Sequence, residues 1–548
     1  MSDQKNPSLQ QQVSRAVLWN ALFVPFRMLA EVAATALKLT VLPIAAYGLL
    51  ALISGASSAF GTWIDLGTTR ALPKFIPETM KTHGPVGVLR MLLNVFWAQS
   101  IVLVTIAAGL IWQQSAYLGT LSAKIHADTR IDVVAQTMLQ ELLGSHGWLF
   151  ITIIILMLIT GVAYDMLMAY LNSFFKQRAW NGISLLAGLL PQLLAVVAIL
   201  VAQLTADALR WSVIGILVTA ALAPALAVAL AAWQVVVIWR SAPEAAPQLD
   251  AKAFRWLPEG FLRYTGVSYL MTMTDFVASK SFAVYLTNSI TDAALLWAGA
   301  SLVGMVLSYL YTPLVGITVP LFTRVRSGEG GTIQGAYGSI VRIQMLLLVP
   351  GGVALVLLAK AALQILTPQY ADAVSIVYVL VPCLFVESLL TMAHNVLIVY
   401  EELRLVTVGR VLTLVVIPLG FLLAPTYGVI GLAIAYGSAR LVAGIWATFW
   451  GWQRIGLLWP WRFMFRVCAA SGVMALTLYG CHMLMPALGN ALSMTARLTL
   501  IPSYGLVVLG NAAVFLLVFR LLGGLEQSDR DQLAKMKLPL KKYILQVL

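Results

Sequence analysis

The first long apolar stretch of the chain, residues 13–42, is interrupted by polar side chains at helical spacing. Asn20, Arg27, Glu31 and Lys38 recur at intervals of one or two helical turns, which places them on one face of a helix. A charged side chain inside a membrane helix is costly unless it faces protein or a water-filled cavity. The stretch is therefore predicted to be a membrane helix that lines a polar cavity.

A later stretch, residues 259–287, repeats this arrangement. Ser268, Thr272 and Asp275 follow one another at helical spacing, and Lys280 lies beside them. We predict that this helix faces the first one across the cavity, and that the polar residues of both helices bind substrate.

Two further stretches, 46–69 and 293–322, carry weaker polar faces. In the first of them, Ser54, Ser58 and Asp65 lie on one side of the predicted helix. The alternative explanation is that serine and threonine mark helix–helix contacts, where small side chains allow close packing. That explanation is sufficient for any single hydroxyl, whereas the four polar faces together favour a cavity.

The apolar stretches predict an all-α polytopic membrane protein with fourteen transmembrane helices. A helix needs about 20 apolar residues to span the hydrocarbon. The chain has 548 residues, of which 60% are hydrophobic and 10% charged, which excludes an ordinary soluble domain. The predicted helices are 13–42, 46–69, 88–112, 147–172, 179–204, 211–239, 259–287, 293–322, 333–359, 373–399, 404–424, 427–452, 463–486 and 497–521.

The positive charges predict the orientation of the chain. Lysine and arginine concentrate in alternate loops and in both terminal segments, which places both termini in the cytoplasm by the positive-inside rule. The net charge of +13 is therefore attributed to topology and not to nucleic-acid binding. The predicted location is a bacterial inner membrane, with anionic inner-leaflet lipids as partners of the basic tail.

Corresponding features of the two halves predict a parallel internal repeat. Pro73 aligns with Pro320, and the polar helix 13–42 aligns with the polar helix 259–287. The predicted organisation is two six-helix lobes plus two C-terminal helices. Its segments are an N-lobe at 1–239, a cytoplasmic linker at 240–258, a C-lobe at 259–452, the added helices within 463–521 and a basic cytoplasmic tail at 522–548.

Other ionisable residues fall inside predicted helices and are candidates for ion coupling, namely Asp165, Glu387 and His394. A carboxylate at a site of low dielectric changes its affinity for a cation with conformation, as proton or sodium coupling requires. Internal neutralisation remains an alternative for neighbouring opposite charges such as Asp275 and Lys280.

Basic residues gather at the predicted cytoplasmic ends of the polar helices. Arginine binds phosphate oxygens through a bidentate fork, so this mouth could attract a diphosphate head group. The alternative is that the topology alone requires positive charge there. The residues concerned are Arg70, Lys74, Arg263, Arg324 and Arg326.

Motifs for cofactor chemistry are not found. The sequence has no Walker-type phosphate loop, no glycine-rich dinucleotide turn, no nucleophile elbow and no cysteine or histidine spacing for a metal. We therefore expect no cofactor, no metal and no enzymatic activity.

Three segments resemble a known group of transporters. Residues 65–78 after the second predicted helix, the turn 400–404 and residues 425–437 are similar to the polysaccharide-type flippases of the MOP superfamily, which handle O-antigen or exopolysaccharide repeat units. The resemblance implies alternating access: the protein would take an undecaprenyl-diphosphate-linked oligosaccharide from the inner leaflet and release it at the outer leaflet. Arg27 matches a basic cavity residue of that group, and Lys280 is the candidate on the seventh helix.

Two other functions remain open at this point. The buried charges of this sequence are close to balanced, which departs from the strongly cationic cavity of the flippases. The alternative transporter is a MATE-type exporter of cationic drugs, coupled to sodium or protons through the buried acids. The third possibility is a membrane subunit of a polysaccharide synthase complex that does not itself transport. Polysaccharide polymerase or export proteins are the partners expected for a surface-polysaccharide role.

Overall fold

The computed structural model describes residues 31–173, 177–240, 257–311, 318–326, 328, 331–484 and 499–525. Within these ranges the chain forms helices and no strand. Eleven helices of this described part are long and apolar enough to span a membrane. A helix satisfies its backbone hydrogen bonds internally, which is what the bilayer interior demands of a spanning segment. The protein is therefore an all-helical, multi-pass membrane protein.

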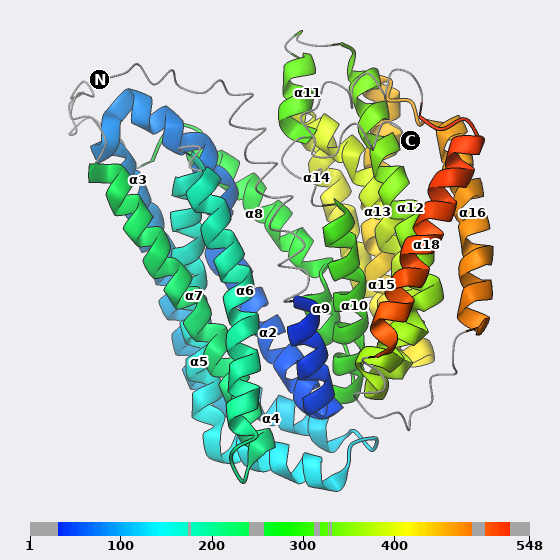
Figure 1. Cartoon of the computed structure of the whole chain (residues 1–548). Helices are drawn as coiled ribbons and strands as arrows, with labels where there is room; N and C mark the ends of the chain where they lie inside the picture. Colours follow the sequence, from blue (N-terminus) through cyan, green and yellow to red (C-terminus); the bar gives the residue numbers. More distant parts are fainter. Residues whose placement is uncertain are drawn as a thin grey trace, which may run out of the picture. The chain divides into compact units, whose positions relative to one another are not determined.

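The described residues divide into two compact units, with the boundary between Trp297 and Ala298. The first unit begins with a helical segment at residues 31–41. Its other helices are α2 (Ile44–Asp65), α3 (Thr68–Trp112), α4 (Gln114–His126), α5 (Val133–Ser173), α6 (Gln177–Ala202), α7 (Ala208–Arg240), α8 (Phe261–Val277), α9 (Lys280–Tyr285) and the first turns of α10 (Ile290–Tyr311) (Figure 1).

Helix α2 is central to the first unit, since it contacts α3, α5, α8 and α9. A buried cluster joins α3, α5 and α8, in which Phe75 lies 5.2 Å from Phe261 between ring centroids. Helices α5, α6 and α7 lie alongside one another (Figure 1) and bury Leu171, Ile183 and Ala231. Apolar packing against the neighbouring helices thus fixes the position of α2, and with it the position of the polar side of this helix.

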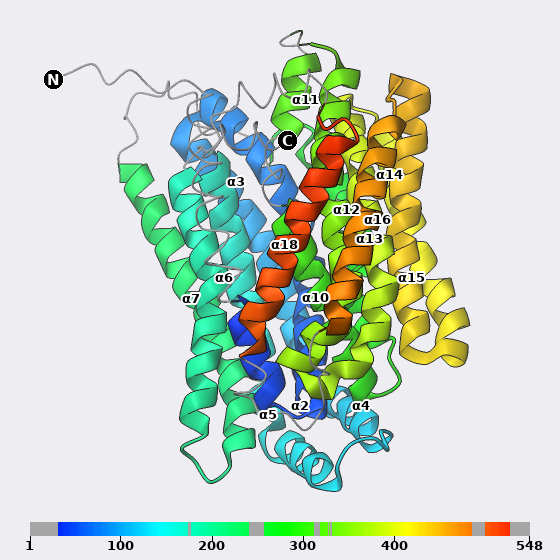
Figure 2. The ribbon, with the colours of Figure 1, turned by 45° about the vertical axis from the view of Figure 1, so that its right-hand side comes forward.

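The second unit contains the rest of α10 and the helices that follow it. These are α11 (Thr318–Arg326), α12 (Ile333–Leu366), η2 (Pro368–Ala373), α13 (Val374–Val399), α14 (Leu403–Val411), η3 (Leu412–Val415), α15 (Val416–Ile455), α16 (Trp461–Leu484) and α18 (Leu500–Leu521). Helix α13 packs between α12 and α15. Helices α16 and α18 lie side by side (Figure 2), joined by the rings of Phe463 and Phe519 at 5.5 Å.

Helix α15 bends sharply at Gly428, where the backbone has φ 56° and ψ −133°. A Cβ atom on Gly431 would collide with the carbonyl oxygen of Leu423. Residues eight positions apart in a straight helix are separated by about 12 Å along the axis, so the chain folds back here (Figure 2). The indole of Trp446 accordingly donates to the carbonyl oxygen of Leu405, at 2.9 Å.

The predicted number of fourteen helices is not confirmed, and three changes, which involve four of the predicted helices, explain the difference from the eleven candidate spans. Most of 13–42 lies outside the described residues. The predicted helix 259–287 is interrupted: α8 ends at Val277, and Ser279 caps the separate helix α9 by accepting from the Phe282 amide. The predicted helices 404–424 and 427–452 belong to the one folded stretch that runs through α14, η3 and α15.

Several organisational predictions remain predictions. The linker at 240–258 and the tail at 522–548 fall largely outside the described residues. In the structure, α8 and α9 contact helices of the first unit. The predicted division of the chain stays a prediction, as does the internal repeat. Its parts are the lobes at 1–239 and 259–452 and the added pair within 463–521.

Candidate functional site

The candidate site is a cavity of about 270 Å³ inside the first unit. Its walls come from α2, α3 and α5, three helices that contribute to candidate membrane spans. The described residues that line it supply two carboxylates, one amide and three hydroxyls, and none of these described lining residues is basic. The lining residues are Ser54, Ser57, Ser58, Gly61, Asp65, Gln99, Met157, Leu158, Gly161, Val162 and Asp165.

Asp65 is positioned by a tight turn between α2 and α3. Leu66 and Gly67 both adopt positive φ angles, 52° and 75°. A Cβ atom on Gly67 would lie 2.5 Å from the Thr265 carbonyl oxygen, so only glycine fits against α8 here. The turn brings the Asp65 carboxylate over the start of α3, where its oxygens accept from the amides of Gly67 at 3.1 Å and Thr69 at 3.0 Å.

Gly67 is the N-cap residue of α3, and Asp65, two residues before it, accepts from amides at the start of this helix. The first amides of a helix lack partners within the helix, and a carboxylate there satisfies them and stabilises the positive end of the helix dipole. The hydroxyl of Thr69 also donates to Asp65. Asp65 therefore lines the cavity as a carboxylate whose charge is already partly compensated.

Asp165 lies on the wall contributed by α5. It follows Gly161 by one helical turn, and both line the cavity. The Asp165 side chain is exposed, unlike the apolar residues that follow it. Within the described part of the chain, its carboxylate makes no hydrogen bond and no ion pair.

Gln99 closes the cavity from α3 and is 3% exposed. Its amide nitrogen donates to the Thr68 hydroxyl at 2.7 Å and to the Asp65 carbonyl oxygen at 3.2 Å. Its side-chain oxygen is buried and has no hydrogen-bond partner among the described residues. The cavity thus contains an acceptor to which no described residue donates a hydrogen bond.

The four polar residues predicted on the seventh helix lie in the first unit but do not line this cavity. The Asp275 carboxylate is 2.7 Å from the Arg70 guanidinium, so its ion partner comes from α3. The Thr272 hydroxyl donates to the carbonyl oxygen of Ser268, which is buried. Lys280 places its ammonium 4.3 Å from the centre of the Trp297 ring.

The polar residues predicted on the first helix are only partly described. Asn20 and Arg27 lie outside the described residues. Glu31 and Lys38 belong to the helical segment at 31–41, and the Lys38 ammonium donates to the Gln192 side-chain oxygen at 2.6 Å. That this segment faces the side of α8 that carries Asp275 stays a prediction.

The basic residues predicted at the cytoplasmic mouth fall into two groups. Arg70, Lys74 and Arg263 belong to the first unit, where the Lys74 ammonium lies 4.6 Å from the Tyr264 ring centre. Arg326 belongs to the second unit and pairs with Glu401 at 3.2 Å. The side chain of Arg324 lies outside the described part.

The two candidates for ion coupling in the second unit are bound to basic partners. The Glu387 carboxylate lies 3.2 Å from the Arg440 guanidinium and accepts the Thr391 hydroxyl at 3.1 Å. The His394 ring lies 3.2 Å from an Arg410 guanidinium nitrogen. In each pair the candidate residue lies on α13, and its arginine partner lies on the neighbouring α14–α15 stretch.

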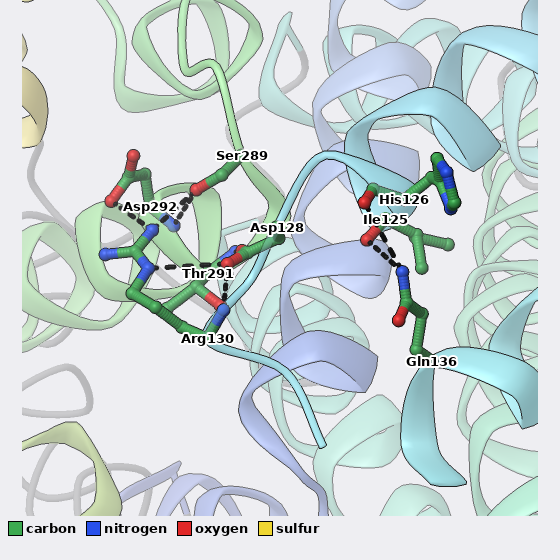
Figure 3. Close-up of polar contacts among 8 residues, drawn as sticks. All are labelled: Ile125, His126, Asp128, Arg130, Gln136, Ser289, Thr291 and Asp292. Atoms are coloured by element: carbon green, nitrogen blue, oxygen red, sulfur yellow. Dashed lines mark hydrogen bonds and ion pairs between the residues drawn. The ribbon is translucent and has the colours of Figure 1, made fainter. Parts of the chain in front are cut away.

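A polar network fixes the loop between α4 and α5 to the start of α10 (Figure 3). Asp128 accepts the Thr291 amide at 2.8 Å, and Arg130 is 2.9 Å from Asp292 and 2.7 Å from the Ser289 hydroxyl. Burial by itself raises the pKa of Asp128. The hydrogen bonds from Thr291 and Arg130, with the Arg130 charge, nevertheless hold that pKa below its ordinary value.

Seven of the lining residues were not expected from the sequence, and Ser57, Gln99 and Gly161 are among them. Gln99 left a usable signal, because it is an amide in an otherwise apolar span. Ser57 neighbours the predicted face of α2, and Gly161 leaves no side chain to detect. A group of three or more histidine, cysteine or acidic residues suited to a metal ion does not occur among the described residues.

No protein-family model matches the chain, and no curated protein matches its sequence. Its structure is similar to that of lipid II flippase MurJ in an inward closed conformation, at 12% identity and a TM-score of 0.64, over 91% of this chain and 98% of that chain. An inward-facing MATE multidrug resistance transporter matches at 15% identity and a TM-score of 0.55, over 78% and 94%.

A third similar structure is a MOP superfamily transporter from Pyrococcus furiosus, described by the reverse polarity of its binding pocket. It matches at 15% identity and a TM-score of 0.52, over 81% of this chain and 95% of that chain. Identities this low establish likeness of fold alone. The chain therefore has the fold found in membrane transporters of the MOP superfamily.

Proposed function

We propose that this protein is a transporter that moves an undecaprenyl-diphosphate-linked oligosaccharide from the inner to the outer leaflet by alternating access, for surface polysaccharide biosynthesis. The main support is the extent of its likeness to a lipid II flippase, which includes 91% of this chain, against 78% for the MATE transporter. The sequence segments at 65–78 and 425–437 point to the same class.

The basic surface of the first unit is consistent with a diphosphate head group. Arg70 and Lys74 on α3 and Arg263 on α8 belong to helices that pack together. The Arg70 side chain is 42% exposed while it pairs with Asp275. A guanidinium has five N–H donors, so this pair leaves donors for phosphate oxygens.

The test is the sidedness of the lipid-linked oligosaccharide in cells that express matched amounts of each variant. Arg27→Ala, Arg70→Ala and Lys280→Ala remove candidate head-group contacts. Arg462→Ala is the matched control, because it removes an exposed arginine on α16, outside the first unit. In cells that carry any of the first three variants, we expect the lipid-linked sugar to stay at the cytoplasmic face. Normal sidedness in all three, and in a full deletion, would contradict the flippase proposal.

The cavity also supports a second candidate, a MATE-type exporter of organic cations. Among the described residues, its lining has two carboxylates and no basic side chain, which favours cationic over anionic ligands. Cells that lack the protein should then accumulate a cationic dye, and Asp165→Asn should behave like the deletion. Unchanged dye accumulation with altered lipid sidedness would favour the flippase.

A further inference from the structure

The segment that joins α9 to α10, residues 286–289, is not helical. Helix α9 has only six residues, and α10 begins at Ile290 and continues across the boundary between the two units. A helix as short as α9 is unstable by itself, so its orientation depends on tertiary contacts. The orientation of α10 relative to α9 therefore depends on what binds this segment, the α9–α10 junction.

Two charged side chains on and after α4 bind the two ends of the α9–α10 junction. The Lys124 ammonium, in the last turn of α4, donates to the carbonyl oxygens of Tyr285, at 3.3 Å, and Thr287. The Asp128 carboxylate accepts from the Thr291 amide at 2.8 Å. A helix carries partial negative charge at its C-terminal end and partial positive charge at its N-terminal end. The cation thus lies at the end of α9 and the anion at the start of α10, so each charge matches the helix end that it contacts.

Arg130 adds a second contact at the start of α10 (Figure 3). Its guanidinium lies 2.9 Å from the Asp292 carboxylate and donates to the Ser289 hydroxyl at 2.7 Å. That hydroxyl also accepts from the Asp292 amide at 3.1 Å, which satisfies one of the first amides of the helix. The Asp128 carboxylate orients Arg130 by accepting from its backbone amide at 3.1 Å and from its Nε at 3.3 Å.

The contacts on the two sides of this loop differ in strength. On the side of α5, Gln136 donates to the carbonyl oxygens of Ile125 and His126, at 3.3 and 3.4 Å, and so fixes the end of α4. On the side of α10, the Arg130 side chain is 50% exposed and Asp292 is 20% exposed. An ion pair with this exposure is weak, because water competes for both charges. The loop therefore has a firm base on α5 and a contact with α10 that can open.

We propose that residues 124–130 form a releasable latch, which holds the α9–α10 junction in its present conformation and must open before α10 can rotate relative to α9. Lys124 and Asp128 bind two helix ends at one spacing, so a change in the angle between the helices breaks at least one of these contacts. The latch thus favours one conformation through contacts that the other conformation lacks. All of these contacts lie within the protein. The proposal therefore goes beyond the flippase proposal and does not depend on it.

The experiment measures how often the junction opens, through the reactivity of one cysteine. Thr287→Cys places a thiol at a position that is 2% exposed, in the full-length protein with its three native cysteines replaced by serine. A buried thiol reacts with N-ethylmaleimide only after opening, so the labelling rate of the purified protein in detergent reports the open fraction.

We expect Arg130→Gln to raise the labelling rate by about tenfold, because it removes a charge-assisted contact. Asp292→Asn should raise the rate less, and should add nothing when combined with Arg130→Gln, since both variants break the same pair. Arg130→Lys keeps the charge and should raise the rate less than Arg130→Gln. The matched control is Arg210→Gln, which removes an arginine of the same unit whose partner is His146 on α5, and should leave the rate unchanged.

Size-exclusion profiles establish that each variant is folded, and Asp292→Asn decides the test if Arg130→Gln does not fold. The proposal is overturned if a folded variant of this pair leaves the labelling rate unchanged, or if Arg210→Gln raises the rate as much. It is also overturned if the thiol reacts as fast with an intact latch as in the denatured protein, because the junction is then not held. The lipid sidedness assay decides the flippase proposal separately.

Discussion

Asp165 and Glu387 are both carboxylates within long apolar helices, one in each unit, yet their surroundings differ. Glu387 has an arginine 3.2 Å away and a threonine hydroxyl at 3.1 Å. Asp165 has neither among the described residues, and instead lines a polar cavity. The partner that distinguishes Glu387 from Asp165 is Arg440, which lies on another helix. The sequence of the helix that carries each acid therefore does not reveal whether the acid is paired.

The difference teaches which acid is available to a ligand. A buried carboxylate that already pairs with a guanidinium has little negative charge left for a cation, so Glu387 is expected to act in holding α13 to α15. A carboxylate that lacks a protein partner can take one from solution. The predictions below test this contrast through the stability of single variants.

The largest effect is expected for Glu387→Ala. Removing one member of a buried ion pair leaves the other charge uncompensated, which typically costs 3–5 kcal/mol. Because Arg440 is 36% exposed, we expect about 2–3 kcal/mol, measured as a lower unfolding temperature of the purified protein. The double variant with Arg440→Ala should recover part of the loss. If Glu387→Ala and Asp165→Asn lower the unfolding temperature equally, the proposed difference between a paired and an unpaired acid is wrong.

The next effect concerns the turn that compensates Asp65. Gly67→Ala places a Cβ 2.5 Å from the Thr265 carbonyl oxygen and imposes a side chain at φ 75°. Overpacking and a left-handed backbone together should destabilise the protein by about 2 kcal/mol. Gly260→Ala is the matched control, since that glycine has nearly the same left-handed backbone (φ 78°, ψ −7°) but no atom within 4 Å of the added Cβ. It should cost about half as much.

These residues also show what the sequence could reveal. The apolar runs gave most membrane helices, because length and hydrophobicity are local properties of the chain. The turn at Leu66 and Gly67 and the fold at Gly428 were less visible, since each depends on what packs against it. The interruption between α8 and α9 was missed because the polar spacing continues through Ser279.

The candidate site was predictable to a similar extent. Ser54, Ser58, Asp65 and Asp165 were singled out as polar residues in apolar helices, and all four line the cavity. Their partners could not be predicted: Arg70 pairs with Asp275 over a long sequence separation. Pairing of this kind is decided by tertiary packing, which brings α3 against α8.

A third acid, Asp128, has protein partners as Glu387 does, but it lies outside the membrane spans. Its hydrogen bonds and Arg130 lower its pKa, so it contributes stability above its ordinary pKa that is lost as the pH falls through the lowered value. Asp128→Asn should therefore cost about 1 kcal/mol at pH 7. The gap to wild type in unfolding temperature should narrow below about pH 4. A gap that is constant from pH 7 to pH 3 would exclude this charge effect.

The smallest effect is expected for Asp165→Asn in sodium-free buffer. Asp165 has no hydrogen bond or ion pair with a described residue, so its neutralisation removes repulsion from Asp65 and leaves packing unchanged. Stability should therefore shift by no more than about 0.5 kcal/mol. A loss as large as that of Glu387→Ala, without sodium, would mean that Asp165 holds helices together as Glu387 does. The ion-free measurement therefore separates a structural acid from one that waits for a ligand.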